Sequence, residues 1–128
     1  MTQVVFDATA LLALLEAETP HQALDDLVGS AVLSAIGADE VLTVLGRRGV
    51  PLAQAMALVI DTGIHIVDFT YEHATAAARI QADPAGAALG VSARAALALG
   101  LVLDATVVTA DPALERFAHL GVRVAPVA

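Results

Sequence analysis

The sequence of 128 residues contains no cysteine and no lysine. Without cysteine the chain forms no disulfide, which fits a protein of the reducing cytoplasm. No apolar run reaches the roughly 18 residues that cross a bilayer. The first residues lack the basic region of a signal peptide, so we expect none. We therefore expect a cytoplasmic protein that does not enter a membrane.

Positive charge is scarce. The 6 basic residues, all of them arginine, face 14 acidic residues and leave a net charge of −8. Nucleic-acid binding without sequence preference depends on basic side chains that neutralise phosphates. This balance excludes binding through a broad basic surface. If the protein binds a phosphate backbone, either a few arginines cluster or a metal ion supplies the charge.

Apolar residues make up 58% of the chain, and short apolar runs alternate with longer amphipathic segments. This alternation indicates a single α/β domain over residues 1–128, with a mostly parallel sheet flanked by helices. Pro126 suggests that the last strand lies at an edge of the sheet. The predicted strands are 4–6, 31–34, 64–68, 106–109 and 122–127, and the predicted helices are 11–16, 21–28, 36–48, 52–60, 71–81, 93–103 and 112–120.

Helix starts carry recognisable capping residues. Thr19, with Pro20 at the first helical position, is assigned as the N-cap of the second helix, and Ser92 as that of the helix over residues 93–103. Thr70 precedes the helix over 71–81, but His73 stands where a good capping box has Glu or Gln.

Three acidic residues follow three of the predicted strands. Asp7 ends the first strand, Glu40 lies one turn into the helix after the second, and Asp111 follows the fourth. The carboxyl ends of parallel strands open on one edge of a sheet, so these carboxylates can converge. Mg²⁺ and Mn²⁺ prefer oxygen ligands of this kind and can activate water against a phosphodiester.

Each acid also has a plain structural explanation. Asp111 is a good N-cap whatever the function. Glu40 could be a surface acid that compensates the helix dipole. Asp7 has the weakest such explanation, because an unpaired carboxylate beside an apolar strand is costly. The three acids together suggest a metal site without fixing a function.

Four segments give a more specific signal. They are residues 4–15 (VVFDATALLALL), 33–42 (LSAIGADEVL), 107–111 (VVTAD) and 121–124 (GVRV). In their order and spacing they resemble PIN domains, and specifically the VapC-type ribonuclease toxins of toxin–antitoxin pairs. Gly37 departs from this pattern, because close relatives often have Asn there.

The resemblance implies a three-layer sandwich with a five-stranded sheet and a metal-dependent endoribonuclease activity on an RNA substrate. It assigns Asp7, Glu40 and Asp111 as catalytic ligands of Mg²⁺ or Mn²⁺, and Thr9 as the residue that orients Asp7. It also implies a homodimer and a cognate antitoxin, which would cover the groove and place a basic side chain among the acids.

The third motif of the family is incomplete. Relatives have a metal-binding Asp before an Arg that aligns with Arg94, and this chain has Ala93 there. Asp104 is too far along the helix to replace it and is expected to be a turn residue. Either Ala93 is an engineered change or the protein is a natural, degenerate homologue. In both cases we expect weaker metal binding and attenuated activity, and the alternative function is a catalytically inactive PIN domain that serves as a binding or regulatory module.

Other residues give weaker signals. Ser34 and Ser92 lack the partners of a nucleophile, residues 86–90 do not form a phosphate loop, and a flavodoxin-like or receiver domain is disfavoured by the missing second acid and lysine. Arg47, Arg48 and Arg94 could contact RNA phosphates, although the first two could equally stabilise a helix end. The four histidines lack metal-ligand spacing and are expected at the surface or in strands: His21, His65, His73 and His119.

Overall fold

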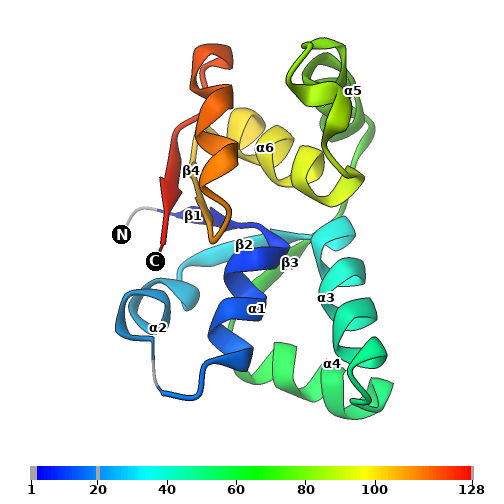
Figure 1. Ribbon diagram of the computed structural model, residues 1–128, viewed down its shortest axis with the longest axis vertical. Coiled ribbons are helices and arrows are strands. Elements are labelled where there is room, and N and C mark those ends of the chain that lie inside the picture. Colours follow the sequence, from blue (N-terminus) through cyan, green and yellow to red (C-terminus); the bar gives the residue numbers. More distant parts are fainter. Residues whose placement is uncertain (1–2, 20, 128) are drawn as a thin grey trace.

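The computed structural model describes residues 3–19 and 21–127 (Figure 1). It contains short strands separated by helices, in the alternation that the sequence predicts. The strands are β1 (Val4–Phe6), β2 (Ala31–Ser34), β3 (His65–Val67), β4 (Thr106–Thr109) and β5 (Val124–Pro126). The helices are α1 (Ala8–Glu16), α2 (Gln22–Val28), α3 (Ala35–Arg47), α4 (Leu52–Asp61), α5 (Tyr71–Ala82) and α6 (Val91–Leu103), with the 3₁₀ helices η1 (Gly86–Ala88) and η2 (Pro112–Leu120).

The five strands form one sheet in the order β3-β2-β1-β4-β5, and every pairing is parallel. Fully buried parallel strands are expected to be apolar throughout, and β1 meets this expectation with Val4, Val5 and Phe6. β5 lies at an edge, as Pro126 predicts. The amide of Val127 donates to Thr109 O (2.8 Å), so the ladder continues past the proline, which has no N–H to give.

Each face of the sheet packs against its own helices, which gives three layers (Figure 1). Side chains alternate along β1, so Phe6 enters the core formed with α1 to α4, whereas Val5 enters the core formed with α5, α6 and η2. The α/β fold class predicted from the sequence is confirmed. Within the described ranges, none of the helices combines the length and apolar character of a membrane span.

Two of the predicted N-caps are wrong, and α1 begins at Ala8, three residues before its predicted start. α2 begins at Gln22, and His21 rather than Thr19 accepts the capping hydrogen bond, from the amide of Leu24 (3.4 Å); Pro20 lies outside the described residues. α6 begins at Val91 with Gly90 as its N-cap, so Ser92 is already inside the first turn. Ser92 is buried, and a residue inside the first turn is not in the position of an N-cap.

The prediction for His73 is also wrong, because this residue is buried rather than exposed or in a strand. Its Nδ1 accepts from the amide of Thr70 (3.4 Å), and Thr70 Oγ1 accepts from the amide of His73 (3.2 Å). These two bonds complete the capping box that a histidine was expected to make poorly. The ring of His73 also packs edge-on against Phe69, with 6.0 Å between ring centroids.

Candidate active site

A cavity of about 140 Å³ lies beyond the carboxyl ends of β1 and β4. It brings together all the site residues that the sequence predicts, although they come from four separate elements. Ligands of open parallel sheets bind at this edge. We call this space the acid cavity, and its lining consists of Asp7, Ala8, Thr9, Glu40, Gly90, Ser92, Ala93, Asp111 and Leu114.

Asp7 is the most enclosed of the three acids, with 3% of its surface exposed. It caps α1, and its Oδ1 accepts from the amide of Ala10 (2.9 Å) and from Thr9 Oγ1 (2.6 Å). Its Oδ2 accepts from Thr109 Oγ1 (2.5 Å). These bonds hold the carboxylate in one orientation, and the hydrogen bond expected from Thr9 is present.

Thr109 is a partner of Asp7 that the sequence analysis did not identify. It is fully buried at the end of β4, next to β1, and its hydroxyl also accepts from the amide of Asp111 (2.9 Å). Thr9 Oγ1 accepts from the amide of Ala110 (2.9 Å). A hydroxyl has one proton to donate, and both threonines give theirs to Asp7. A signal was available, since Asp7-Ala8-Thr9 and Thr109-Ala110-Asp111 are the same three residue types in opposite order.

Burial raises the pKa of the Asp7 carboxyl above its ordinary value, and the negative charge of Asp111 adds to this rise. The hydrogen bonds from Thr109, Thr9 and Ala10 act in the opposite direction, because they stabilise the charged form. The net rise shows that hydrogen bonds alone do not compensate the buried charge. A cation near Asp7 and Asp111 would remove the repulsion between them.

The other two acids keep oxygen atoms free. Asp111 caps η2, where its Oδ1 accepts from the amide of Ala113 (3.0 Å), so its expected capping role is confirmed. Glu40 is exposed on α3, and its carboxylate makes no hydrogen bond or ion pair with residues 3–19 or 21–127. Both carboxylates can therefore bind a ligand at the cavity without first breaking a strong contact.

The donor chemistry of the acid cavity fits a hard divalent cation. Among the described residues, no three His, Cys, Asp or Glu side chains form a group that could directly hold a metal ion. Mg²⁺, however, retains several waters and is usually bound by one or two carboxylates. Each oxygen of Asp7 accepts hydrogen bonds yet belongs to a carboxylate with several acceptor positions. Asp7, Glu40 and Asp111 thus suit a hydrated ion better than a closed cage of protein ligands.

Residues 4–120 match the family model described as PIN domain. This chain belongs to the PIN domain family. No curated protein matches it. Its structural neighbours include the DNA-bound VapBC of Salmonella typhimurium, with a TM-score of 0.78, 16% identity and 98% of each chain covered.

Two further neighbours share the fold of this PIN domain. A toxin–antitoxin complex from Klebsiella pneumoniae has a TM-score of 0.72 at 18% identity, with 98% of each chain covered. VapC20 of Mycobacterium tuberculosis, described as a toxin that cleaves the sarcin–ricin loop, has a TM-score of 0.70 at 16% identity, with 89% of this chain and 94% of that chain covered. The family and the fold suggested by the sequence motifs are confirmed.

Ala93 lies in the first turn of α6 and contributes a methyl group to the lining of the acid cavity. A carboxylate at this position would join Asp7, Glu40 and Asp111 in the lining of the cavity. Asp104 is no substitute, because it follows the other end of α6, in the left-handed conformation (φ 50°), and binds Arg123 (2.9 Å). The interpretation of Asp104 as a turn residue is confirmed.

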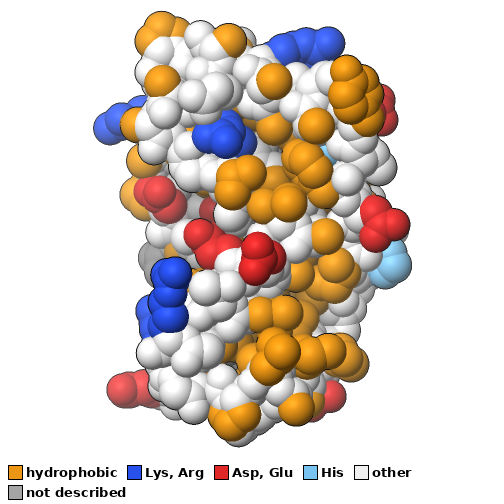
Figure 2. Space-filling model, turned by 90° about the vertical axis from the view of Figure 1, so that its right-hand side faces the viewer, with side chains coloured by type: hydrophobic (Ala, Val, Ile, Leu, Met, Phe, Trp, Pro, Cys, Tyr) orange, Lys and Arg blue, Asp and Glu red, His pale blue; other side chains and the backbone are white. Residues whose placement is uncertain are grey.

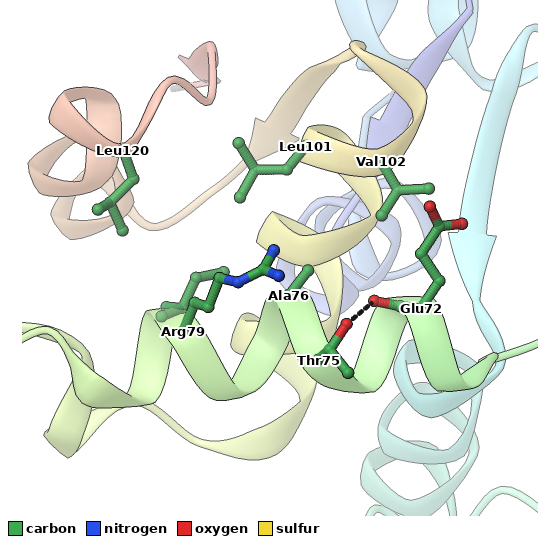
Figure 3. A pocket seen from close by; sticks show the side chains of 8 residues that line it. Glu72, Thr75, Ala76, Arg79, Leu101, Val102 and Leu120 are labelled. Carbon is green, nitrogen blue, oxygen red and sulfur yellow. Dashed lines mark hydrogen bonds between the residues drawn. The ribbon is translucent and has the colours of Figure 1, made fainter.

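A larger cavity of about 540 Å³ lies elsewhere in the PIN domain, between α5, α6 and η2 (Figure 3). Its polar groups are Glu72, Thr75 and Arg79, and Thr75 Oγ1 donates to Glu72 O (2.9 Å). It contains none of the predicted site residues and has a single carboxylate. This cavity is larger than the acid cavity but lacks the group of acids that the sequence predicts for phosphodiester chemistry.

Proposed function

We propose that this PIN domain is a metal-dependent endoribonuclease, the toxin of a toxin–antitoxin pair, in an attenuated form. The observation that carries the proposal is the acid cavity, which Asp7, Glu40 and Asp111 line together at the edge of a parallel sheet. The family and the similarity in fold to VapC toxins support the same class of reaction.

In this proposal Asp7, Glu40 and Asp111 hold Mg²⁺ or Mn²⁺. A bound divalent ion supplies positive charge and Lewis acidity beside the scissile phosphate. Thr9 and Thr109 keep Asp7 oriented through their hydroxyl protons. Without the ion, the three carboxylates would repel the phosphate of the substrate.

The attenuation is assigned to Ala93. A site that lacks one of its expected acids carries less negative charge and offers fewer oxygen ligands, so its affinity for a divalent ion is lower. The same observation favours a second function, that of a catalytically inactive PIN domain acting as a binding or regulatory module.

The partners in this proposal are an antitoxin and a second copy of the chain. Several large apolar side chains are exposed, including Leu52, Met56 and Ile60 along one face of α4. Exposed apolar groups at helical spacing suit a protein partner. An antitoxin would also place a basic side chain in the acid cavity, and a homodimer would bury further apolar surface.

The test compares RNA cleavage by the chain as it stands with cleavage by Ala93→Asp over a range of Mg²⁺ concentrations. Ala93→Asp with Asp7→Asn serves as the inactive control. Strong cleavage by Ala93→Asp alone would support an attenuated ribonuclease. Equal cleavage by both chains would contradict the attenuation, and no cleavage by either would favour the binding module.

A further inference from the structure

A depression of about 350 Å³ continues from the acid cavity along α3. The two spaces share Glu40, Gly90 and Ser92. The depression also extends to Arg47, the last residue of α3. We call it the α3 groove. An RNA strand with one phosphate at the acid cavity could follow this groove along the surface.

The spacing along α3 aligns the groove with the acid cavity. Residues three and four apart lie on one face of a helix, so Glu40, Thr43 and Arg47 follow one another along the same side. Seven residues of helix separate Glu40 from Arg47, which is about 10 Å. Glu40, at the acid cavity, and Arg47 therefore lie at different points along the same α3 groove.

The charged side chains divide the α3 groove into an acidic end and a basic end. The end beside the acid cavity carries Glu40 and Asp39, and the Asp39 carboxylate already accepts from Thr43 Oγ1 (3.1 Å). Arg47 supplies the only positive charge among the described residues that line the groove. Figure 2 shows the face that carries α3 to α5, with acidic side chains near its middle and basic side chains above and below them.

The guanidinium of Arg47 has no partner among the described residues, unlike those of the nearby Arg48 and Arg94. The side chain of Arg47 is exposed and makes no hydrogen bond or ion pair with any other part of the chain that the structure describes. Its neighbour Arg48 pairs with Glu16. Arg94 is half-buried, and its Nη1 donates to Leu89 O (2.6 Å). A guanidinium without an internal partner can give all its donors to a phosphate.

We propose that Arg47 binds a phosphate of single-stranded RNA that runs along the α3 groove, next to the phosphate held at the acid cavity. This inference rests on the proposed ribonuclease function. It adds a binding contact that lies outside the acid cavity and does not depend on the residue at position 93. In a protein of net charge −8, one free arginine at this place decides where the backbone can lie.

Arg47 and Arg48 form a matched pair for the test. Both lie at the end of α3, so Arg47→Gln and Arg48→Gln remove the same charge and disturb the helix dipole alike. The probe is a short, labelled, mixed-sequence single-stranded RNA, and its affinity is measured by fluorescence anisotropy over a series of salt concentrations with Mg²⁺ present. Arg47→Lys keeps the charge, and sedimentation of each variant reports its oligomeric state.

We expect Arg47→Gln to weaken RNA binding by about fivefold at 0.1 M salt, because the loss of one phosphate contact lowers the salt slope by about 0.7 for a single strand. Arg48→Gln should bind like the unchanged protein, and Arg47→Lys should recover most of the affinity. Equal losses in both Gln variants, or a change in oligomeric state confined to Arg47→Gln, would overturn the contact. Cleavage of RNA by Ala93→Asp would be unaffected by that result, so the proposed ribonuclease function and the Arg47 contact can be contradicted independently. If no variant bound RNA, the Arg47 contact would be overturned directly.

Discussion

Two of the helix starts that line the acid cavity are built in opposite ways. At the start of α1, the buried Asp7 caps the helix and receives hydrogen bonds from two threonines and a backbone amide. At the start of α6, Gly90 gives no side-chain cap and Ala93 offers a methyl group. At the first junction, the start of α1, Asp7 has hydrogen-bond partners on α1 and β4. At the second junction, the start of α6, the side chain of Ala93 has no polar atom to bind a partner. We infer that the fold depends on Asp7 and its partners, while position 93 can vary without loss of the fold.

The largest effect on stability is expected from Thr109→Val, which keeps the shape of the side chain and removes its hydroxyl. Asp7 would then lose a buried donor, and the amide of Asp111 would lose its acceptor. Leaving a buried polar group without its partner costs about 1–3 kcal/mol. Urea denaturation should show the free energy of unfolding fall by this amount.

Thr106→Val is the matched control, because it makes the same change at the other end of β4. Within residues 3–19 and 21–127, the Thr106 hydroxyl accepts only a long bond from Arg123 Nε (3.4 Å), at an exposed site. Its loss should change the free energy of unfolding by less than about 0.5 kcal/mol. Similar losses in the two variants would mean that the hydrogen bonds around Asp7 add nothing special to the stability of the fold.

The contrast between the two junctions can be reduced by placing an acid at the second. We expect Ala93→Asp to bind Mg²⁺ at least tenfold more tightly, a gain of about 1.4 kcal/mol, because it adds a carboxylate to the cavity. Isothermal titration calorimetry measures this affinity. Ala93→Asn adds similar bulk without charge and should bind Mg²⁺ no better than the unchanged chain. An equal gain in both variants would attribute the effect to shape.

The sequence predicts the three acids of the candidate site better than it predicts the residues that hold them in place. Periodicity places Asp7, Glu40 and Asp111 after parallel strands, and a parallel sheet then brings them to one edge. Thr109 could not be assigned in the same way, because its bond to Asp7 depends on β1 and β4 being neighbours. The strand order of a sheet is a tertiary property that local patterns do not encode.

Local patterns also fail where a tertiary contact competes with them. Ser92 has the chemistry of an N-cap but is buried at the cavity, and Gly90 takes its place. His73 looks like a surface residue and is buried inside a capping box. Arg47 and Arg48 are equivalent in the sequence, yet only Arg48 has Glu16 as a partner. For the two arginines the deciding neighbour, Glu16, lies outside the local pattern from which the prediction was made.

Asp111 has two roles, because it caps η2 and also lines the acid cavity. Asp111→Asn should keep the cap and cost only a few tenths of a kcal/mol, whereas Asp111→Ala should cost about 1 kcal/mol. Both variants should lose Mg²⁺ affinity to a similar extent, since neither retains the charge. Unfolding and calorimetry on the same samples separate these effects. If Asp111→Asn kept full Mg²⁺ affinity, Asp111 would be a cap and not a ligand.

The smallest effect is expected far from the cavity, where His119 of η2 contacts Asp83 (2.8 Å). The hydrogen bond from His119 lowers the pKa of Asp83, and the same bond raises the pKa of His119 above 6.5. The contribution of His119 to stability is therefore complete below pH 6.5 and is lost as the pH rises through its raised pKa. The contribution of Asp83 is complete above pH 3.8 and is lost as the pH falls through its lowered pKa.

An NMR titration of the His119 ring should show its pKa fall toward the ordinary value in Asp83→Asn, with little change in stability because the pair is exposed. An unchanged His119 pKa in that variant would show that the pair does not persist in solution.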